Sequence, residues 1–310
     1  MPHFKISDIN NYLGFPPIYG FMKTLQFLLS LTKPRIFLAI GLTAWLGFFL
    51  KEDFFSHRFL DSVLLFLATV LASASGAVFN HFFERKTDAK MDRTKKRPLV
   101  DAGPGAIKLA LAFGTGIGIL GHAICWHFFG PVSAFWLFMG WVNYVVIYTL
   151  IFKHHSQWNV TIGSFASSFS VLCGDAAFTG ELTTRGLILA TILFFWNPAH
   201  FWNLTALYQK DYAQADIPML TAWIGRKKVV IMIMSHILIV IACSYALWFY
   251  GNLGLTFLVG SMITGCGLLG LNLQNYFVLS DGLFKRNFIL SNIYLLALYI
   301  TVVLDRLYPI

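Results

Sequence analysis

The chain has 310 residues, of which 57% are hydrophobic and only 12% are charged. Soluble globular domains carry about 25% charged residues, so this composition excludes that class and indicates a membrane protein. The formal net charge of +9 would also suit a nucleic-acid-binding protein. The positions of the basic residues along the chain therefore decide between nucleic-acid binding and membrane topology as the reason for this charge.

Segments that are long and apolar enough to span a bilayer occur about nine times, since a span needs roughly 17–25 predominantly apolar residues. We expect spans at Arg35–Leu50, Leu60–Phe83, Ala106–Phe128, Val132–Phe152, Val160–Phe178, Gly186–Tyr208, Val229–Tyr250, Leu253–Leu273 and Phe288–Leu304. The expected fold is all-α: a polytopic membrane protein whose transmembrane helices form a bundle around a central cavity. We expect residues 1–31 to form a cytoplasmic N-terminal segment and residues 32–310 a single transmembrane domain.

Basic residues gather on one side of this predicted bundle. With the N-terminus in the cytoplasm, only Lys51, Arg58, Arg185 and Arg306 of the 23 Lys and Arg residues fall on the other side. This asymmetry follows the positive-inside rule, so the charge reflects topology, with anionic lipid rather than nucleic acid as a partner. The first twenty residues contain no apolar signal-peptide region and do not resemble a transit segment. We therefore expect a bacterial inner membrane with a cytoplasmic N-terminus.

Most of the small and polar residues inside the predicted spans are explained by helix packing. Four glycines in the third span (Gly114, Gly116, Gly118 and Gly121) indicate close helix packing. The four cysteines lie in apolar spans without metal-ligand spacing and suit core packing, so no disulfide is expected. Asp175 is an ionisable group near the outer end of the fifth span.

The second predicted span ends in a regular series of polar oxygen donors. Asn80, Glu84 and Asp88 recur every four residues, so a helix would place them along one face. Pairs with neighbouring basic residues on a solvated helix end would explain one such acid. Three donors at a fixed step, where an apolar span meets water, favour a site instead. Carboxylate and amide oxygens suit a hard cation such as Mg²⁺.

Basic residues follow these acids immediately. They are Arg93, Lys95, Lys96 and Arg97. Lysine supplies a point charge and arginine a bidentate fork for phosphate oxygens, so the stretch predicts a metal–diphosphate site at a membrane surface. Lys33 and Arg35 lie at the start of the first span. Two functions fit these residues: a cytoplasmic anchor or phosphate binding.

The sixth span carries polar groups at membrane depth. Pro198 interrupts its helical hydrogen bonding, and Asn197 and His200 lie beside it. Such groups usually face a cavity, although a lone histidine often makes only a helix–helix hydrogen bond. A second acidic loop, containing Asp211 and Asp216, follows directly. We expect the ends of the second and sixth spans to face each other across one cavity.

Three stretches together resemble the UbiA-type intramembrane prenyltransferases. The stretches are Asn80-x3-Glu84-x3-Asp88-x2-Met91-x-Arg93-Thr94-x2-Arg97-Pro98-Leu99, Pro198-x-His200-Phe201-Trp202, and Asp211-Tyr212-x3-Asp216-Ile217-Pro218-Met219-Leu220. The acid series marks the whole superfamily. The arginine-rich ending and the other two stretches make the chain most similar to the heme O synthase branch, the protoheme IX farnesyltransferases.

This resemblance implies an enzyme that transfers a farnesyl group from farnesyl diphosphate to a vinyl group of protoheme IX (heme b), giving heme O. It implies that Asn80, Glu84, Asp88 and Asp211 hold Mg²⁺ and act in catalysis with Arg93 and Arg97. The other residues expected to bind substrate are Lys33, Arg35, Lys153, His200, Trp202, Tyr212 and Asp216. Heme A synthase or oxidase assembly proteins would be downstream partners.

The chain departs from the family pattern in two places. Ser167-Ser168-Phe169-Ser170-Val171 replaces a Gly-Ala-x-Pro-Pro stretch, and Asp216 stands where glycine is usual. One alternative function is therefore a UbiA-type prenyltransferase with an aromatic or quinone-precursor acceptor. Another, of a different class, is a non-catalytic haem-handling scaffold for oxidase assembly. A transporter would carry polar residues along several midspans, which this chain lacks.

Overall fold

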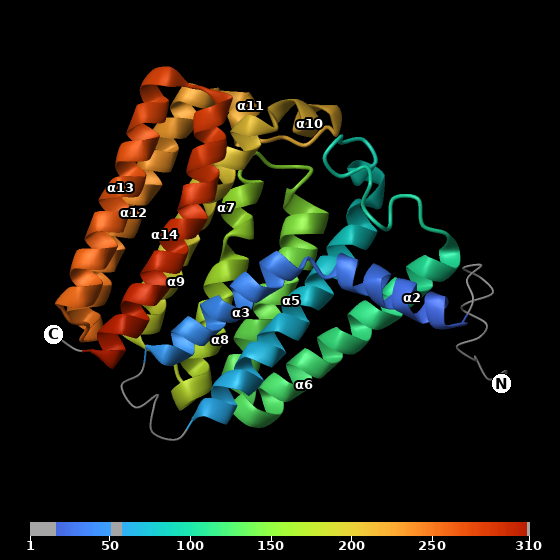
Figure 1. Ribbon diagram of the computed structural model, residues 1–310, viewed down its shortest axis with the longest axis horizontal. Coiled ribbons are helices and arrows are strands. Elements are labelled where there is room, and N and C mark those ends of the chain that lie inside the picture. The colour runs from blue at the N-terminus through green and yellow to red at the C-terminus, as the bar shows by residue number, and fades with distance from the viewer. Residues whose placement is uncertain (1–16, 51–57, 309–310) are drawn as a thin grey trace.

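The computed structural model describes residues 17–50 and 58–308, and within these ranges every regular element is a helix, as predicted. The helices are α2 (Pro17–Leu31), α3 (Pro34–Phe49), α5 (Phe59–Asp88), α6 (Pro104–Val142), the π-helix η1 (Asn143–Phe152), α7 (Asn159–Gly163), α8 (Phe165–Thr179), α9 (Thr184–Leu207), α10 (Gln209–Gln214), α11 (Leu220–Ile224), α12 (Arg226–Gly251), α13 (Leu255–Val278) and α14 (Asp281–Leu307). The long helices lie side by side, with the short α10 and α11 across one end (Figure 1).

The number of spans depends on how two interrupted helices are counted. Among the described residues, seven helices are long and apolar enough to cross a membrane, or eight if the bent pair Gly20–Leu31 and Pro34–Phe49 is one span. One of the seven, Pro104–Phe152, has 49 residues. At 1.5 Å per residue it is more than twice the thickness of a bilayer core, so it must bend or cross twice. The predicted count of nine requires it to be two spans.

A break inside α6 divides this long helix close to the predicted boundary between the third and fourth spans. Gly130 has φ 79° and ψ −179°, outside the helical region, and Pro131 follows it. Proline cannot donate a backbone hydrogen bond to the preceding turn, and glycine tolerates the positive φ. The chain therefore turns between Phe128 and Val132, where the two predicted spans were separated.

The predicted N-terminal segment has two parts. Residues 1–16 lie outside the described ranges, whereas residues 17–31 form α2. The bend between α2 and α3 is 56°. It coincides with Lys33, whose φ of 52° is left-handed, and with Pro34. Because proline disfavours helical geometry in the residue before it, the helix stops there and restarts.

Close helix contacts depend on small residues, as the glycine pattern of the third span predicted. A Cβ on Gly121 of α6 would come within 2.7 Å of the Ala68 carbonyl oxygen of α5. Gly116 faces open space, so the packing interpretation fails for that glycine. On the outer surface many large apolar side chains are exposed, such as Ile119 and Phe277. This is the arrangement expected of helices that pack on each other and face lipid.

Asp175 and the cysteines have structural surroundings. Asp175 is fully buried and accepts hydrogen bonds from the backbone nitrogen (2.6 Å) and the hydroxyl (2.7 Å) of Thr183, which precedes α9. The carboxylate thus joins the end of α8 to the start of α9. Cys125 and Cys173 are buried free thiols whose sulfurs lie 3.9 Å apart. Both fit the predicted absence of a disulfide.

Candidate functional site

Charged residues from distant parts of the chain meet at one end of the bundle. The end of α5, the start of α3, the end of η1 and the loop after α5 all contribute, and α10 lies beside that loop (Figure 1). The residues of this group, called the charged cluster below, are Lys33, Asn80, Glu84, Asp88, Arg97 and Lys153. The cluster lies where the apolar part of α5 ends, as the sequence predicted.

The predicted series of oxygen donors lies on one face of α5. This helix continues to Asp88, five residues beyond the predicted span, so all three donors are helical. Asn80 and Glu84 are 2% exposed, and Asp88 is 0% exposed. Buried carboxylates are costly unless they are paired, so the chain must supply partners. Because these three side chains are buried, the end of α5 that carries them is not simply a solvent-exposed helix end.

Cationic side chains from other elements supply those partners. Lys153, at the end of η1, forms an ion pair with Glu84. The Nη1 of Arg97 lies 2.7 Å and 2.8 Å from the two oxygens of Asp88, and 3.7 Å from Glu84 Oε2. The Nζ of Lys33 donates to the Asn80 amide oxygen at 2.5 Å. Each oxygen donor of the series is thus bound to a cation.

The π-helix η1 contacts two donors of α5, since Thr149 contacts Asn80 and Lys153 at its end pairs with Glu84. In a π-helix, residues five apart lie above one another. Thr149 accepts a hydrogen bond from the Asn80 amide nitrogen at 3.1 Å, and the Tyr144 hydroxyl lies 3.3 Å from Lys33 Nζ. Sequence reasoning did not assign Tyr144 to the site. The only available signal was the spacing of Tyr144, Thr149 and Lys153.

Arg93 connects the two acidic loops. Its backbone nitrogen lies 3.4 Å from Asp211 Oδ2, and its Nη2 lies 3.2 Å from the Tyr212 hydroxyl. The guanidinium also lies over the Tyr208 ring, 5.3 Å from its centre. The predicted approach of the loops after the second and sixth spans is therefore present, and Arg93 joins them.

Asp216 also contacts the first loop, in an unusual backbone conformation. Its φ is 56°, in the left-handed region, where glycine has the least strain. Its carboxylate pairs with Lys90 at 3.1 Å, and both side chains are largely exposed. The side chain that replaces the usual glycine thus adds a loop-to-loop ion pair to a conformation that glycine would adopt more easily.

Three predicted substrate-binding residues lie outside both the charged cluster and the two acidic loops. Arg35 is exposed and makes no hydrogen bond or ion pair with a described residue of the cluster. His200 stacks between Trp196 and Phe288, with ring centres 4.8 Å and 4.3 Å away, and its Nδ1 lies 2.7 Å from the Ser291 hydroxyl of α14. Trp202 is buried against His236 of α12. The roles of these residues stay predictions.

His154 and Lys95 contribute little positive charge to the charged cluster. Partial burial, and then the charge of Lys153, lower the pKa of His154, so this ring is neutral at neutral pH. Lys95 is exposed and donates to Asp92 at 2.6 Å. The positive charge near the acids therefore comes from the lysines and arginines that contact them.

The sequence predicts that the oxygen donors of α5 hold Mg²⁺. Within residues 17–50 and 58–308, no group of three or more His, Cys, Asp or Glu side chains is arranged to hold a metal ion. The donor types of Asn80, Glu84 and Asp88 do suit a hard cation. Their oxygens bond instead to lysine and arginine. The donors fit Mg²⁺ chemically, and a metal would have to displace these cations.

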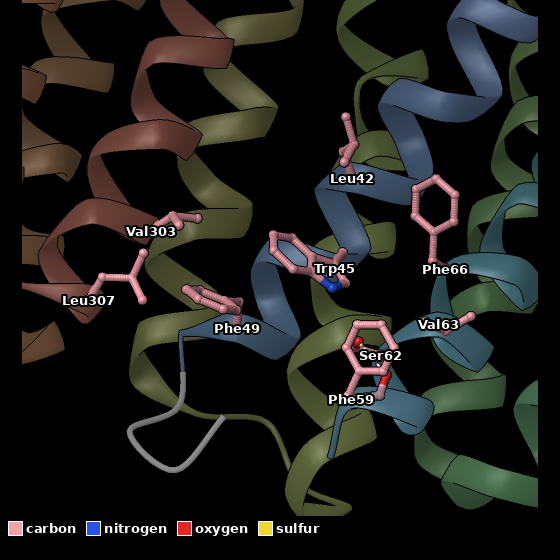
Figure 2. Close-up of a pocket in the computed structure, with 9 residues that line it drawn as sticks. All are labelled: Leu42, Trp45, Phe49, Phe59, Ser62, Val63, Phe66, Val303 and Leu307. Carbon is pink, nitrogen blue, oxygen red and sulfur yellow. Dashed lines mark hydrogen bonds between the residues drawn. The ribbon is translucent and has the colours of Figure 1, made fainter. Parts of the chain in front are cut away.

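Two apolar hollows lie away from the charged cluster. One has a volume of about 510 Å³ and lies between the far ends of α3 and α5 and the end of α14; Trp45, Phe49 and Phe66 line it (Figure 2). The other, about 720 Å³, lies beside α5 and α6 and includes His122 and Trp141. Neither is lined by a predicted site residue.

These features define an integral, multi-pass membrane protein with buried acids and bases at one end of its bundle. Residues 37–296 match the model of the UbiA prenyltransferase family. The chain belongs to this family, as its motifs predicted. The protein named Protoheme IX farnesyltransferase 1 of Paramagnetospirillum magneticum is 37% identical over 278 residues, covering 90% of this chain and 97% of that protein.

Solved structures show the same fold. A structure described as digeranylgeranylglyceryl phosphate synthase in membranes superposes with a TM-score of 0.75, covering 92% of this chain and 99% of that chain. A UbiA homolog from Archaeoglobus fulgidus, bound to GPP and Mg²⁺, superposes with a TM-score of 0.63 and covers 89% of this chain and 99% of that chain. Both are 15% identical to this chain. The likeness therefore concerns the fold.

Proposed function

We propose that this protein transfers a farnesyl group from farnesyl diphosphate to a vinyl group of protoheme IX, giving heme O. The observation that carries the proposal is the charged cluster, since acids and cations are concentrated at the end of an otherwise apolar bundle. A substrate with a diphosphate head and an apolar chain matches that distribution. The name of the relative from Paramagnetospirillum magneticum supports the choice of acceptor.

The cations of the cluster would bind the departing diphosphate. As the bond between the farnesyl carbon and the diphosphate oxygen breaks, negative charge develops on the diphosphate. Lys33, Arg97 and Lys153, which contact Asn80 and Glu84, would stabilise it. Arg93 would bind it from the first loop, where its backbone nitrogen contacts Asp211 of the facing loop. Bound Mg²⁺ would supply further charge neutralisation, held by Asn80, Glu84, Asp88 and Asp211.

The apolar bundle would protect the reactive farnesyl carbon from water. A vinyl carbon of protoheme IX then forms the new carbon–carbon bond, and hydroxide from water adds to the neighbouring carbon, which gives a hydroxyethylfarnesyl side chain. Tyr212 and Asp216 would bind substrate from the second loop, and His200 and Trp202 would position the porphyrin. Arg35 would act at the membrane surface, where it is exposed.

We infer the setting of this reaction from the charge distribution. The site end would face the cytoplasm of a bacterial inner membrane, with residues 32–310 acting as one prenyltransferase domain. Anionic lipid would contact its basic surface. Proteins that consume heme O, such as heme A synthase or oxidase assembly proteins, would act downstream.

The test is mass spectrometry of haem extracted from membranes that contain the protein, supplied with heme b, farnesyl diphosphate and Mg²⁺. We expect a haem heavier by a farnesyl group plus a hydroxyl group. Asp88→Asn should abolish this product, because it removes a charge from the cluster. Asp92→Asn, which changes an exposed acid paired with Lys95, should retain it.

Other outcomes separate the competing functions. Release of diphosphate in a Mg²⁺-dependent way without modified haem would support a prenyltransferase with another acceptor. The absence of both products, from protein shown to be folded, would contradict an enzymatic function and favour a haem-handling scaffold.

A further inference from the structure

His81 lies beside the charged cluster and has no assigned function. It follows Asn80 directly on α5 and precedes Glu84 by three residues and Asp88 by seven. Positions three and seven apart lie on the same side of a helix. His81 therefore shares the side of α5 that carries the buried acids.

The His81 ring is buried without a hydrogen-bond partner. The residue is 4% exposed, and neither Nδ1 nor Nε2 contacts a donor or acceptor. No other histidine within the described residues has both ring nitrogens buried and unpartnered. Buried polar atoms without partners cost free energy and are rare, so such a group calls for a partner from outside the protein.

The charges around the ring indicate which partner this is. Lys33 binds the amide oxygen of the preceding residue, Asn80, and Arg97 lies against Glu84 and Asp88 on the same side of α5 as His81. An anion attracted by Lys33 and Arg97 would come within reach of the ring. An imidazole ring carries at least one N–H donor, so it can donate to such an anion.

We propose that His81 is a further substrate-binding residue, whose N–H donates a hydrogen bond to an oxygen of the diphosphate. The proposal rests on the proposed function, since it assigns a ligand to the same site. It adds an N–H donor to the cations of the cluster, and a hydrogen bond, which is directional, fixes the orientation of the diphosphate in a way that charge alone does not. The histidine thus acts together with Lys33 and Arg97.

The experiment measures binding of inorganic pyrophosphate with Mg²⁺ to the purified full-length protein in detergent. His81→Phe keeps an aromatic ring and removes both nitrogens, so it should weaken binding about tenfold or more, as expected for loss of a hydrogen bond to a charged group. His81→Asn and His81→Gln place an amide near Nδ1 and Nε2 respectively. One of them should restore most of the binding.

The matched control is His122→Phe. His122, on α6, also has a buried, unpartnered Nε2 but lies in the second apolar hollow. Its replacement should leave pyrophosphate binding unchanged. The same variants should show a raised KM for farnesyl diphosphate only at position 81, whereas a merely structural role would lower thermal stability without changing KM.

Distinct results would overturn the two proposals. Unchanged pyrophosphate binding by His81→Phe, beside normal binding by the parent, would refute the role of His81 alone. If the parent protein binds no pyrophosphate, the diphosphate site of the proposed function fails as well. If His81→Phe does not fold, the two amide variants decide: unequal binding supports the proposal, and equal, parent-like binding contradicts it.

Discussion

Glu84 and Lys153 form a buried ion pair where α5 meets η1, with Arg97 near the other oxygen of Glu84. In a low-dielectric environment each charge needs the other, because desolvation of an unpaired ion is expensive. The same pairing occupies the oxygens that a metal would need. A bound diphosphate and its metal would have to exchange these contacts.

Replacing Lys153 tests this dependence at the scale of one residue. Lys153→Met should lower the free energy of unfolding by about 3 kcal/mol, because it leaves the charge of Glu84 buried and only partly compensated by Arg97. The measurement is thermal or denaturant unfolding of the purified protein in detergent.

Two further variants show whether the loss comes from the uncompensated charge. Glu84→Gln combined with Lys153→Met should be more stable than Lys153→Met alone. Lys95→Met, which breaks an exposed pair with Asp92, should leave the unfolding midpoint unchanged. A double variant no more stable than Lys153→Met would contradict the explanation.

Helix α6 approaches α5 so closely that the contact depends on glycine. A Cβ at Gly121 would press on the Ala68 carbonyl and the Ala72 nitrogen, at 2.7 Å and 2.9 Å. These are backbone atoms, which cannot move aside without shifting the whole helix. The spacing of the two helices, and with it the position of the acids on α5, therefore rests on this contact.

Alanine substitutions in α6 should distinguish contact glycines from exposed ones. Gly121→Ala should destabilise the protein by about 1–3 kcal/mol, the usual cost of overpacking. Gly116→Ala, at a position with nothing within 4 Å, should change stability by less than about 1 kcal/mol, since alanine also favours the helix. Thermal unfolding of both variants gives the comparison, and equal losses would contradict the packing argument.

At the scale of the whole molecule, the distribution of basic residues predicts which end of the bundle faces the cytoplasm. Thiol labelling tests this orientation. Lys95→Cys, beside the site, and Glu181→Cys, between α8 and α9, place exposed thiols at opposite ends. In a background where the exposed Cys266 is serine, a membrane-impermeant maleimide should label only position 181 in bacterial spheroplasts. In inverted vesicles it should label only position 95, and the reverse pattern would contradict the orientation.

Much of the architecture follows from local properties of the chain. Composition determines the membrane class, and runs of apolar residues place the spans, because each helix must bury its own backbone hydrogen bonds in lipid. The four-residue step of Asn80, Glu84 and Asp88 aligns them on one face, because helical periodicity is a local property. The sequence alone was sufficient for these features.

Tertiary structure decided how the donors are paired. Lys33, Arg97 and Lys153 reach the acids of α5 from other segments. The π-helix was not predicted, because an apolar run gives no signal of a widened turn. His81 was overlooked because a lone histidine beside a motif looks ordinary until its ring is found buried without a partner. Contacts between distant segments depend on how the helices pack against one another. The spacing of residues within one segment does not determine that packing.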